Sequence, residues 1–304
     1  MYVLQQLING LSQGSIYALM AIGYTLIVGV VGLITFAYGE MVMIGAMSAY
    51  LFYTYVTPNF FLGLLVAFIS SGIAGIFIHK VAYERFLDAP KSIALLCTVG
   101  CSLLIKNLAQ IAFGSQGNAM PPAFETKPFY LFGTDLYITT IHMVVIAIVV
   151  VLAIGLSLFL YKTRVGLMLR AVSQDKMAAS LVAINVKKVT IRTMAISGAI
   201  CGLVGMMEAY GVRGNYQDGI SNEYYFDGLL VAMIMGYRPV GIIVMSFFFA
   251  FLKVGAAGME LNAGVPGELY RIIQSVVIFF MAAEGGVKAL LKVRRAGKEG
   301  AKHG

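Results

Sequence analysis

The chain has 304 residues, of which 60% are hydrophobic and 12% are charged, and its mean hydropathy is +0.86. A soluble globular domain carries about 25% charged residues, so this composition excludes that class and predicts an all-α, polytopic transmembrane helical bundle. The net charge of +8 does not indicate nucleic-acid binding, because 17 of the 22 basic residues lie in segments that we assign to the cytoplasm. That bias reflects membrane orientation and contact with anionic lipid.

In chain order, the sequence contains nine apolar segments, at residues 3–31, 39–56, 60–80, 91–113, 139–161, 188–210, 225–236, 240–258 and 268–288. At 1.5 Å per residue, the longer segments cover the hydrocarbon core of a bilayer, which is about 30 Å thick. The segment 225–236 is too short to cross. We therefore expect about eight spanning helices plus one discontinuous or half-length helix.

Basic residues predict the orientation of these segments. The loops 80–91 and 162–187 and the tail 288–304 are rich in lysine and arginine, which places them in the cytoplasm. The N-terminus and the proline-containing loop 114–136 are then outside. The chain is thus expected to be one transmembrane domain, residues 1–287, with a short basic cytoplasmic tail from 288 to 304.

The sequence carries no motif for catalysis or metal binding. Walker A, HExxH and Ser/His/Asp patterns are absent, so we expect neither enzymatic activity nor ATP hydrolysis by this chain. Cys97, Cys101 and Cys201 sit inside apolar segments, where they are better explained as small buried residues than as a disulfide or a metal site. We therefore predict that the chain itself binds no cofactor and no metal.

Polar residues inside the apolar segments are candidates to line a translocation path, because charges in a membrane are costly and usually functional. Some instead join neighbouring helices by hydrogen bonds, and Arg271 and Glu284 lie near segment ends, where charged side chains can reach the interface. The path candidates are Asn9, Gln13, Tyr17, Tyr24, Glu40, Lys106, Asn107, Gln110, Glu208 and Asp227.

Two pairs of glycines recur at four-residue spacing. Gly10 with Gly14, and Gly198 with Gly202, allow close approach of another helix. The neighbour is either a helix of the same chain or a second subunit.

A polar, basic island from Arg164 to Asn185 separates two long apolar segments, although spanning a bilayer does not require it. Ser173 or Asp175 is placed to cap a short helix there. Spacing of i, i+3, i+4 and i+7 puts Asp175, Ala178, Ala179 and Val182 on one face, where small residues let another surface come close. An ordinary cytoplasmic loop is the alternative.

The order of residues in this island resembles the cytoplasmic loop of ABC importer permeases of the LivH/LivM branched-chain amino acid class. Ala183 departs from the pattern, because the family usually has glycine at that position. The resemblance implies a coupling helix that docks in a groove of an ATPase subunit. It assigns to this coupling loop Gly166, Arg170, Ala171, Asp175, Ala178, Ala179, Val182 and Ile184.

Two upstream segments are similar to the same family. Thr35 to Glu40 resembles its Asn-Phe-Ala-His-Gly-acid element, with threonine and tyrosine replacing asparagine and histidine, and Thr98 to Ser115 also matches. The last third, including Met207 to Gly211 and Pro239 to Gln274, looks more like the nucleoside and simple-sugar permeases of the same superfamily.

The resemblance implies a permease subunit in the cytoplasmic (inner) membrane of a prokaryote. Its expected partners are a second permease, identical or different, two ATPase subunits that use ATP, and an extracytoplasmic substrate-binding protein. The substrates would be branched-chain or other hydrophobic amino acids, with nucleosides or simple sugars as the alternative. The alternative from another functional class is a self-contained secondary transporter, in which Glu40 and Glu208 bind ions or protons.

Overall fold

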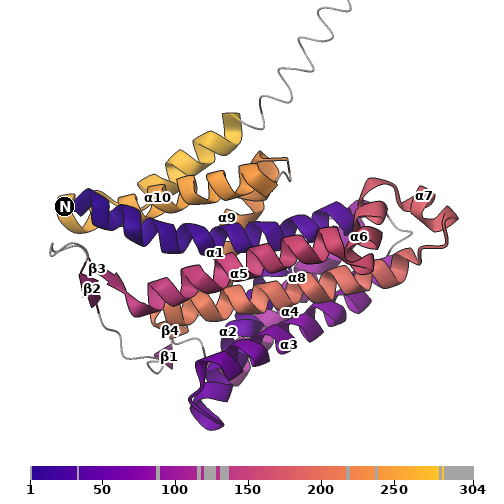
Figure 1. Ribbon diagram of the computed structural model, residues 1–304, viewed down its shortest axis with the longest axis horizontal. Coiled ribbons are helices and arrows are strands. Elements are labelled where there is room, and N and C mark those ends of the chain that lie inside the picture. Colours follow the sequence, from indigo (N-terminus) through magenta and orange to yellow (C-terminus); the bar gives the residue numbers. More distant parts are fainter. Residues whose placement is uncertain are drawn as a thin grey trace, which may run out of the picture.

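The computed structural model describes residues 2–32, 34–86, 90–114, 118–119, 128–130, 137–216, 220–236, 239–280 and 283. Within these ranges the protein consists of helices and a few very short strands (Figure 1). The long helices run roughly side by side, and they are α1 (Tyr2–Val31), α2 (Tyr38–Tyr55), α3 (Phe60–Ile78), α4 (Lys91–Phe113), α5 (Thr140–Lys162), α8 (Val186–Glu208), α9 (Ile220–Ile234) and α10 (Pro239–Ala263). A last helical segment covers Leu269–Phe280.

Six of the described helices are long and apolar enough to cross a membrane, namely α1, α3, α4, α5, α8 and α10. The predicted half-length helix is α9, whose 15 residues cover about 22 Å and so fall short of the hydrocarbon core. These observations confirm an all-α, multi-pass membrane protein. The expected eight crossings and the placement of the termini stay predictions.

The core forms around α8, which is buried along most of its length. Glycines make this burial possible: a Cβ on Gly202 would collide with the carbonyl of Ala67 in α3, and one on Gly205 with the carbonyl of Val42 in α2. On α1, Gly10 and Gly14 accommodate the rings of Phe251 and Phe247 of α10. Both glycine pairs therefore pack against helices of the same chain. Only glycine, which has no Cβ, permits such close contact between the helices.

The two ends of the bundle differ (Figure 1). One end carries the N-terminus and two small antiparallel pairs, β1 (Asn118–Ala119) with β4 (Asn215–Tyr216) and β2 (Pro128–Tyr130) with β3 (Tyr137–Thr139). The opposite end carries α6 (Arg164–Gln174) and α7 (Lys176–Leu181). The described strand residues of the loop predicted to be external, 118–119 and 128–130, thus lie at the end of the long helices opposite to the polar island.

Short irregular helical turns extend two of the long helices. The π-helix η1 (His79–Tyr83) and the 3-10 turn η2 (Glu84–Phe86) follow α3, and the π-helix η3 (Ala209–Arg213) follows α8. Some predicted features lie outside the described residues, namely Glu284, the basic tail 288–304 and most of the loop 114–136.

Candidate functional site

The polar island folds into two short helices with separate caps. Asp175 begins α7, because its Oδ1 accepts hydrogen bonds from the backbone N–H groups of Met177 at 2.8 Å and Ala178 at 3.0 Å. Its own N–H is donated to the carbonyl of Ala171 at 3.2 Å, which closes the last turn of α6. The sequence predicted a cap at Ser173 or Asp175, and the structure confirms Asp175.

The helix α6 is held tightly to the end of α5. Gly166 is buried, and a Cβ there would collide with the backbone carbonyl of Leu160. Two turns of α6 bury Leu169 and Val172 against the body of the protein. Arg170 lies on another side, where its guanidinium stands 4.9 Å from the centroid of the Tyr161 ring. Gly166 is therefore needed for the close packing of α6 against α5, and α6 in turn carries α7.

The helix α7 has a packed side and an open side. Ala179 is 3% exposed and packs in a small apolar cluster with Val30 of α1 and Val172 of α6. On the open side, Leu181 is 83% exposed and Met177 is 76% exposed. Of the four residues predicted to share one face, Ala179 is buried, whereas Asp175, Ala178 and Val182 are exposed. Asp175 and Val182 are the caps of this very short helix, and Ala179 packs against α1. The docking role of this face stays a prediction.

The end of α7 has the geometry of a Schellman motif. The N–H of Ile184 is donated to the carbonyl of Ala179 at 3.1 Å, and that of Ala183 to the carbonyl of Ser180 at 3.2 Å. Ala183 occupies the left-handed region, with φ of 61°. This conformation favours glycine, which is the residue that the family pattern usually has at this position, and it makes alanine unfavourable here.

One lysine connects α7 to the membrane bundle. Lys176, the first residue of α7, donates from Nζ to the carbonyl of Val31 at 2.5 Å. Val31 is the last residue of α1, where helix carbonyls lack partners within the helix and the dipole favours a cation. Sequence reasoning missed this contact, because the two residues are 145 positions apart.

Deep in the bundle, Asp227 of α9 is the centre of a hydrogen-bond network. Its Oδ2 accepts from the hydroxyl of Tyr17 at 2.7 Å and forms an ion pair with Nζ of Lys253 at 3.3 Å. Its Oδ1 accepts from Nε2 of Gln274 at 2.8 Å and from the hydroxyl of Tyr270 at 3.2 Å. The carboxylate is thus satisfied by residues of α1, α10 and the last helical segment.

Two of the ten path candidates, Tyr17 and Asp227, therefore meet in one hydrogen-bond network. The sequence analysis overlooked Lys253, although it is the one charged residue between positions 240 and 258 and so carried the same signal as the other intramembrane charges. Lys253 Nζ also donates to the Tyr17 hydroxyl at 2.9 Å. This arrangement joins helices, which is the alternative role that the sequence left open.

Glu40 lies in the first turn of α2 and is 1% exposed. Its Oε1 accepts a hydrogen bond from the hydroxyl of Ser102 at 3.0 Å, so the carboxylate lies against α4. Further along α4, Lys106 and Gln110 are half-buried and Asn107 is exposed, with its amide donating to the carbonyl of Leu103 at 2.6 Å. These α4 residues line the outer side of the chain.

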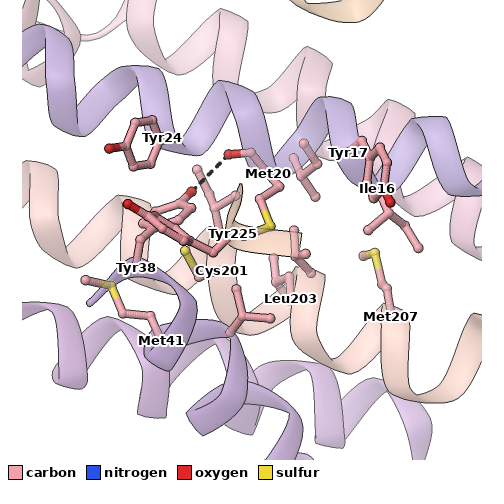
Figure 2. Close-up of a cluster of buried hydrophobic side chains, with 14 of the residues drawn as sticks. Ile16, Tyr17, Met20, Tyr24, Tyr38, Met41, Cys201, Leu203, Met207 and Tyr225 are labelled. Carbon is pink, nitrogen blue, oxygen red and sulfur yellow. Dashed lines mark hydrogen bonds between the residues drawn. The ribbon is translucent and has the colours of Figure 1, made fainter. Parts of the chain in front are cut away.

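The remaining candidates lie in separate places. Tyr24 belongs to a buried aromatic group with Tyr38 and Tyr225, at ring-centroid distances of 5.1 and 6.1 Å from Tyr24 (Figure 2). Tyr38 replaces the family's histidine, and its hydroxyl donates to the carbonyl of Met20 at 3.0 Å. Glu208 is fully buried at the end of α8.

On α1, Gln13 is buried and Asn9 is half-buried, with Asn9 accepting from Gln5 at 3.2 Å. Within the described residues, the ten candidates therefore do not converge on one cavity. Asn9 and Asn107 bond to residues four positions away, whereas Tyr17, Asp227 and Glu40 draw their partners from distant parts of the sequence.

A multi-pass helical bundle with charged groups among its helices, and with a capped helix pair projecting from one end, is an architecture that suits a membrane transport protein. The chain belongs to the family of branched-chain amino acid transport system permease components, whose model matches residues 6–282. This confirms the resemblance stated from the sequence and places the chain among transport permease components.

Individual relatives agree with the family assignment. The chain is 31% identical over 230 residues to the high-affinity branched-chain amino acid transport system permease protein LivH of Escherichia coli, covering 71% of this chain and 74% of that protein. It is 32% identical over 227 residues to BraD of Pseudomonas aeruginosa, covering 69% and 73%. The guanosine ABC transporter permease protein NupP of Bacillus subtilis is 28% identical over 231 residues, covering 74% and 62%. No solved structure matches the chain.

Proposed function

We propose that this chain is the membrane-spanning permease subunit of an ATP-driven importer for branched-chain or other hydrophobic amino acids. It works in the cytoplasmic membrane of a prokaryote with a second permease, two ATPase subunits and an extracytoplasmic binding protein. The family and the LivH and BraD relatives support the transport class and favour these substrates. ATP is bound by the partner subunits, and this chain contributes the translocation path.

The open side of α7 is the observation that carries the ATP-driven mechanism. Met177, Leu181 and Val182 are large apolar side chains exposed at the end of the molecule opposite the strands. Exposed apolar patches of this kind mark sites that a partner covers. The cap at Asp175 and the packing of Ala179 hold α7 in place, so a force applied to its open side reaches the bundle. Closure of the ATPases on ATP would then shift the long helices and alternate access.

The alternatives are less well supported. A self-contained secondary transporter using Glu40 and Glu208 needs no projecting helix pair, and the family describes one component of a transport system. A nucleoside permease is the second candidate, because NupP matches over 74% of this chain. The identity to LivH and BraD is higher, which favours amino acids.

The proposal is tested by purifying the tagged chain from membranes of its native host and identifying the proteins that accompany it. We expect an ATPase and a second permease. In the same host, deletion of the gene should reduce uptake of radiolabelled leucine and leave guanosine uptake unchanged. Recovery of the chain alone, with leucine uptake intact after deletion, would contradict the importer and its substrate together.

The docking role of α7 has its own prediction. Replacing Leu181 with aspartate places a charge on the open side, so the variant should insert normally but lose ATPase subunits during purification and take up little leucine. Ser173→Asp is the matched control, because Ser173 is exposed on α6 and not on α7. Normal ATPase recovery with Leu181→Asp would show that α7 is not the docking element.

A further inference from the structure

We propose that α3 and α8 together form a binding site for an anionic phospholipid at the end that we assign to the cytoplasm. The site is called the α3–α8 surface here. It comprises three cations and two apolar side chains, namely Lys80, Lys188, Arg192, Ile73 and Phe77. The inference goes beyond the proposed function, because it concerns the lipid around the protein and does not depend on the substrate.

A contact between η1 and α8 brings the three cations to one level. Nε2 of His79 forms a hydrogen bond of 3.2 Å with the hydroxyl of Thr190. Lys80 directly follows His79. Lys188 precedes Thr190 by two residues, and Arg192 follows it by two. At 1.5 Å of rise per residue, the backbones of all three cations therefore lie within about 3 Å of the level of this contact along the helices.

The helix α2 covers one flank of the pair formed by α3 and α8. The hydroxyl of Ser71 in α3 donates to the carbonyl of Met41 in α2 at 2.7 Å. Gly205 of α8 packs against the carbonyl of Val42, also in α2. Since α2 contacts both helices, the side chains that α3 and α8 expose lie on the opposite flank, where they share one surface.

The shared surface combines apolar side chains with the cations. Ile73, Phe77 and Lys80 follow one another at i, i+4 and i+7, on the exposed side of α3. Ile73 is 61% exposed and Phe77 is 54% exposed. Lys188 and Arg192, which are four residues apart, are exposed on one side of α8. The surface is thus apolar towards the middle of the membrane and cationic towards its edge.

The charges of this region call for an anion from outside the chain. Residues 79–86 and 186–192 together contain five basic residues and one acidic residue, Glu84. In the described part of the chain, none of the three cations of the α3–α8 surface is paired with a carboxylate. One acid cannot neutralise five bases, so the region keeps a positive charge that attracts an anionic group.

The depth of the cations identifies this anion as a lipid phosphate. Lys80 lies six residues before the end of the candidate membrane span Phe60–Phe86. Arg192 lies six residues after the start of the span Val186–Gly211. Six residues correspond to about 9 Å of helix, so both side chains begin inside the membrane and can extend to the phosphate level at its edge. The acyl chains of the lipid would cover the apolar part of the surface, from which a free anion gains nothing.

Lipid contact can be measured directly, because the chain contains no tryptophan. The full chain carrying Phe77→Trp is reconstituted in phosphatidylcholine vesicles with a fixed fraction of brominated phosphatidylglycerol or brominated phosphatidylcholine. Bromine quenches tryptophan fluorescence on contact. We expect the relative binding constant to favour the anionic lipid at least about fivefold, the effect of one cation near an anionic surface. Phe61→Trp, exposed at the other end of α3, is the matched reporter and should show no preference.

Substitutions of the cations are then made in the Phe77→Trp chain. Lys80→Gln combined with Arg192→Gln should abolish the preference, whereas Arg192→Lys should retain it. Lys187→Gln is the control, since it removes the same charge beside Lys188, about 100° around the helix from it, and should leave the preference in place. Circular dichroism of each variant verifies that the helices are retained.

The outcomes decide between a lipid site and its alternatives. Preference for phosphatidylglycerol at Phe77→Trp, lost with the double substitution and kept with Lys187→Gln, supports the site. Equal quenching by the two lipids at Phe77→Trp overturns it. Displacement of the anionic lipid by excess inorganic phosphate also overturns it, because the ligand would then be a soluble anion. An equal loss with Lys187→Gln would reduce the effect to the general charge of this end and contradict a site. None of these results changes the importer assignment, which uptake tests separately.

Discussion

At the scale of single residues, Ala183 is the clearest case of a side chain in an unfavourable backbone conformation. Its φ of 61° costs an L-residue about 1 kcal/mol relative to glycine. Ala183→Gly should therefore stabilise the end of α7 by about 1 kcal/mol, which is a factor of roughly five in the local opening equilibrium.

Amide hydrogen exchange of the purified protein measures this effect. The N–H of Ile184, which closes the Schellman motif, should exchange about five times more slowly in Ala183→Gly. Ala183→Val should have the opposite effect, because a β-branched residue tolerates the left-handed region even less. Equal exchange in the glycine variant and the wild-type protein would mean that the conformation is not strained.

At the scale of elements, the link between α7 and α1 is the shortest connection from the proposed docking surface to the bundle. Replacing Lys176 with methionine keeps the apolar stem but removes the hydrogen bond to the carbonyl of Val31. ATP hydrolysis should continue, while the amount of leucine transported per ATP falls roughly fivefold, a typical size for one coupling interaction.

The ratio of leucine transported to ATP hydrolysed is measured with the complete importer complex reconstituted in liposomes. Lys176→Arg should retain the coupling, because arginine can also donate to the end of α1. Lys187→Met, which removes an exposed lysine near the start of α8, is the control. An unchanged ratio in Lys176→Met would show that motion reaches the bundle by another route, such as α6.

The same elements show what sequence can and cannot predict. The helices were predictable because long uncharged segments leave few other structures in a membrane, and the α7 cap was predictable because Asp175 acts on N–H groups two and three residues away. Which side of α7 packs against the bundle was not predictable from the sequence, because it depends on the contact of Ala179 with Val30 of α1. Likewise, Asp227 draws its partners from positions 17, 253, 270 and 274, which no local spacing connects.

At the scale of the whole molecule, the Asp227 network fastens three membrane helices and the last helical segment into one unit. Removing one partner of a buried ion pair leaves the other charge uncompensated, at a cost of about 3 kcal/mol, although the partial exposure of Lys253 reduces this figure. Asp227→Asn should therefore lower the denaturation midpoint of the detergent-solubilised protein more than Glu40→Gln does.

A double-mutant cycle distinguishes a network that stabilises the protein from a transport site. Asp227→Asn with Lys253→Met removes both charges, so the double variant should be at least about 1 kcal/mol more stable than the sum of the single effects implies. It should also recover leucine uptake along with its stability, because the pair joins α9 to α10 and its loss acts through the packing of these helices. Recovery of stability without recovery of uptake would instead place Asp227 on the path, where the substrate would cross beside α1 and α10.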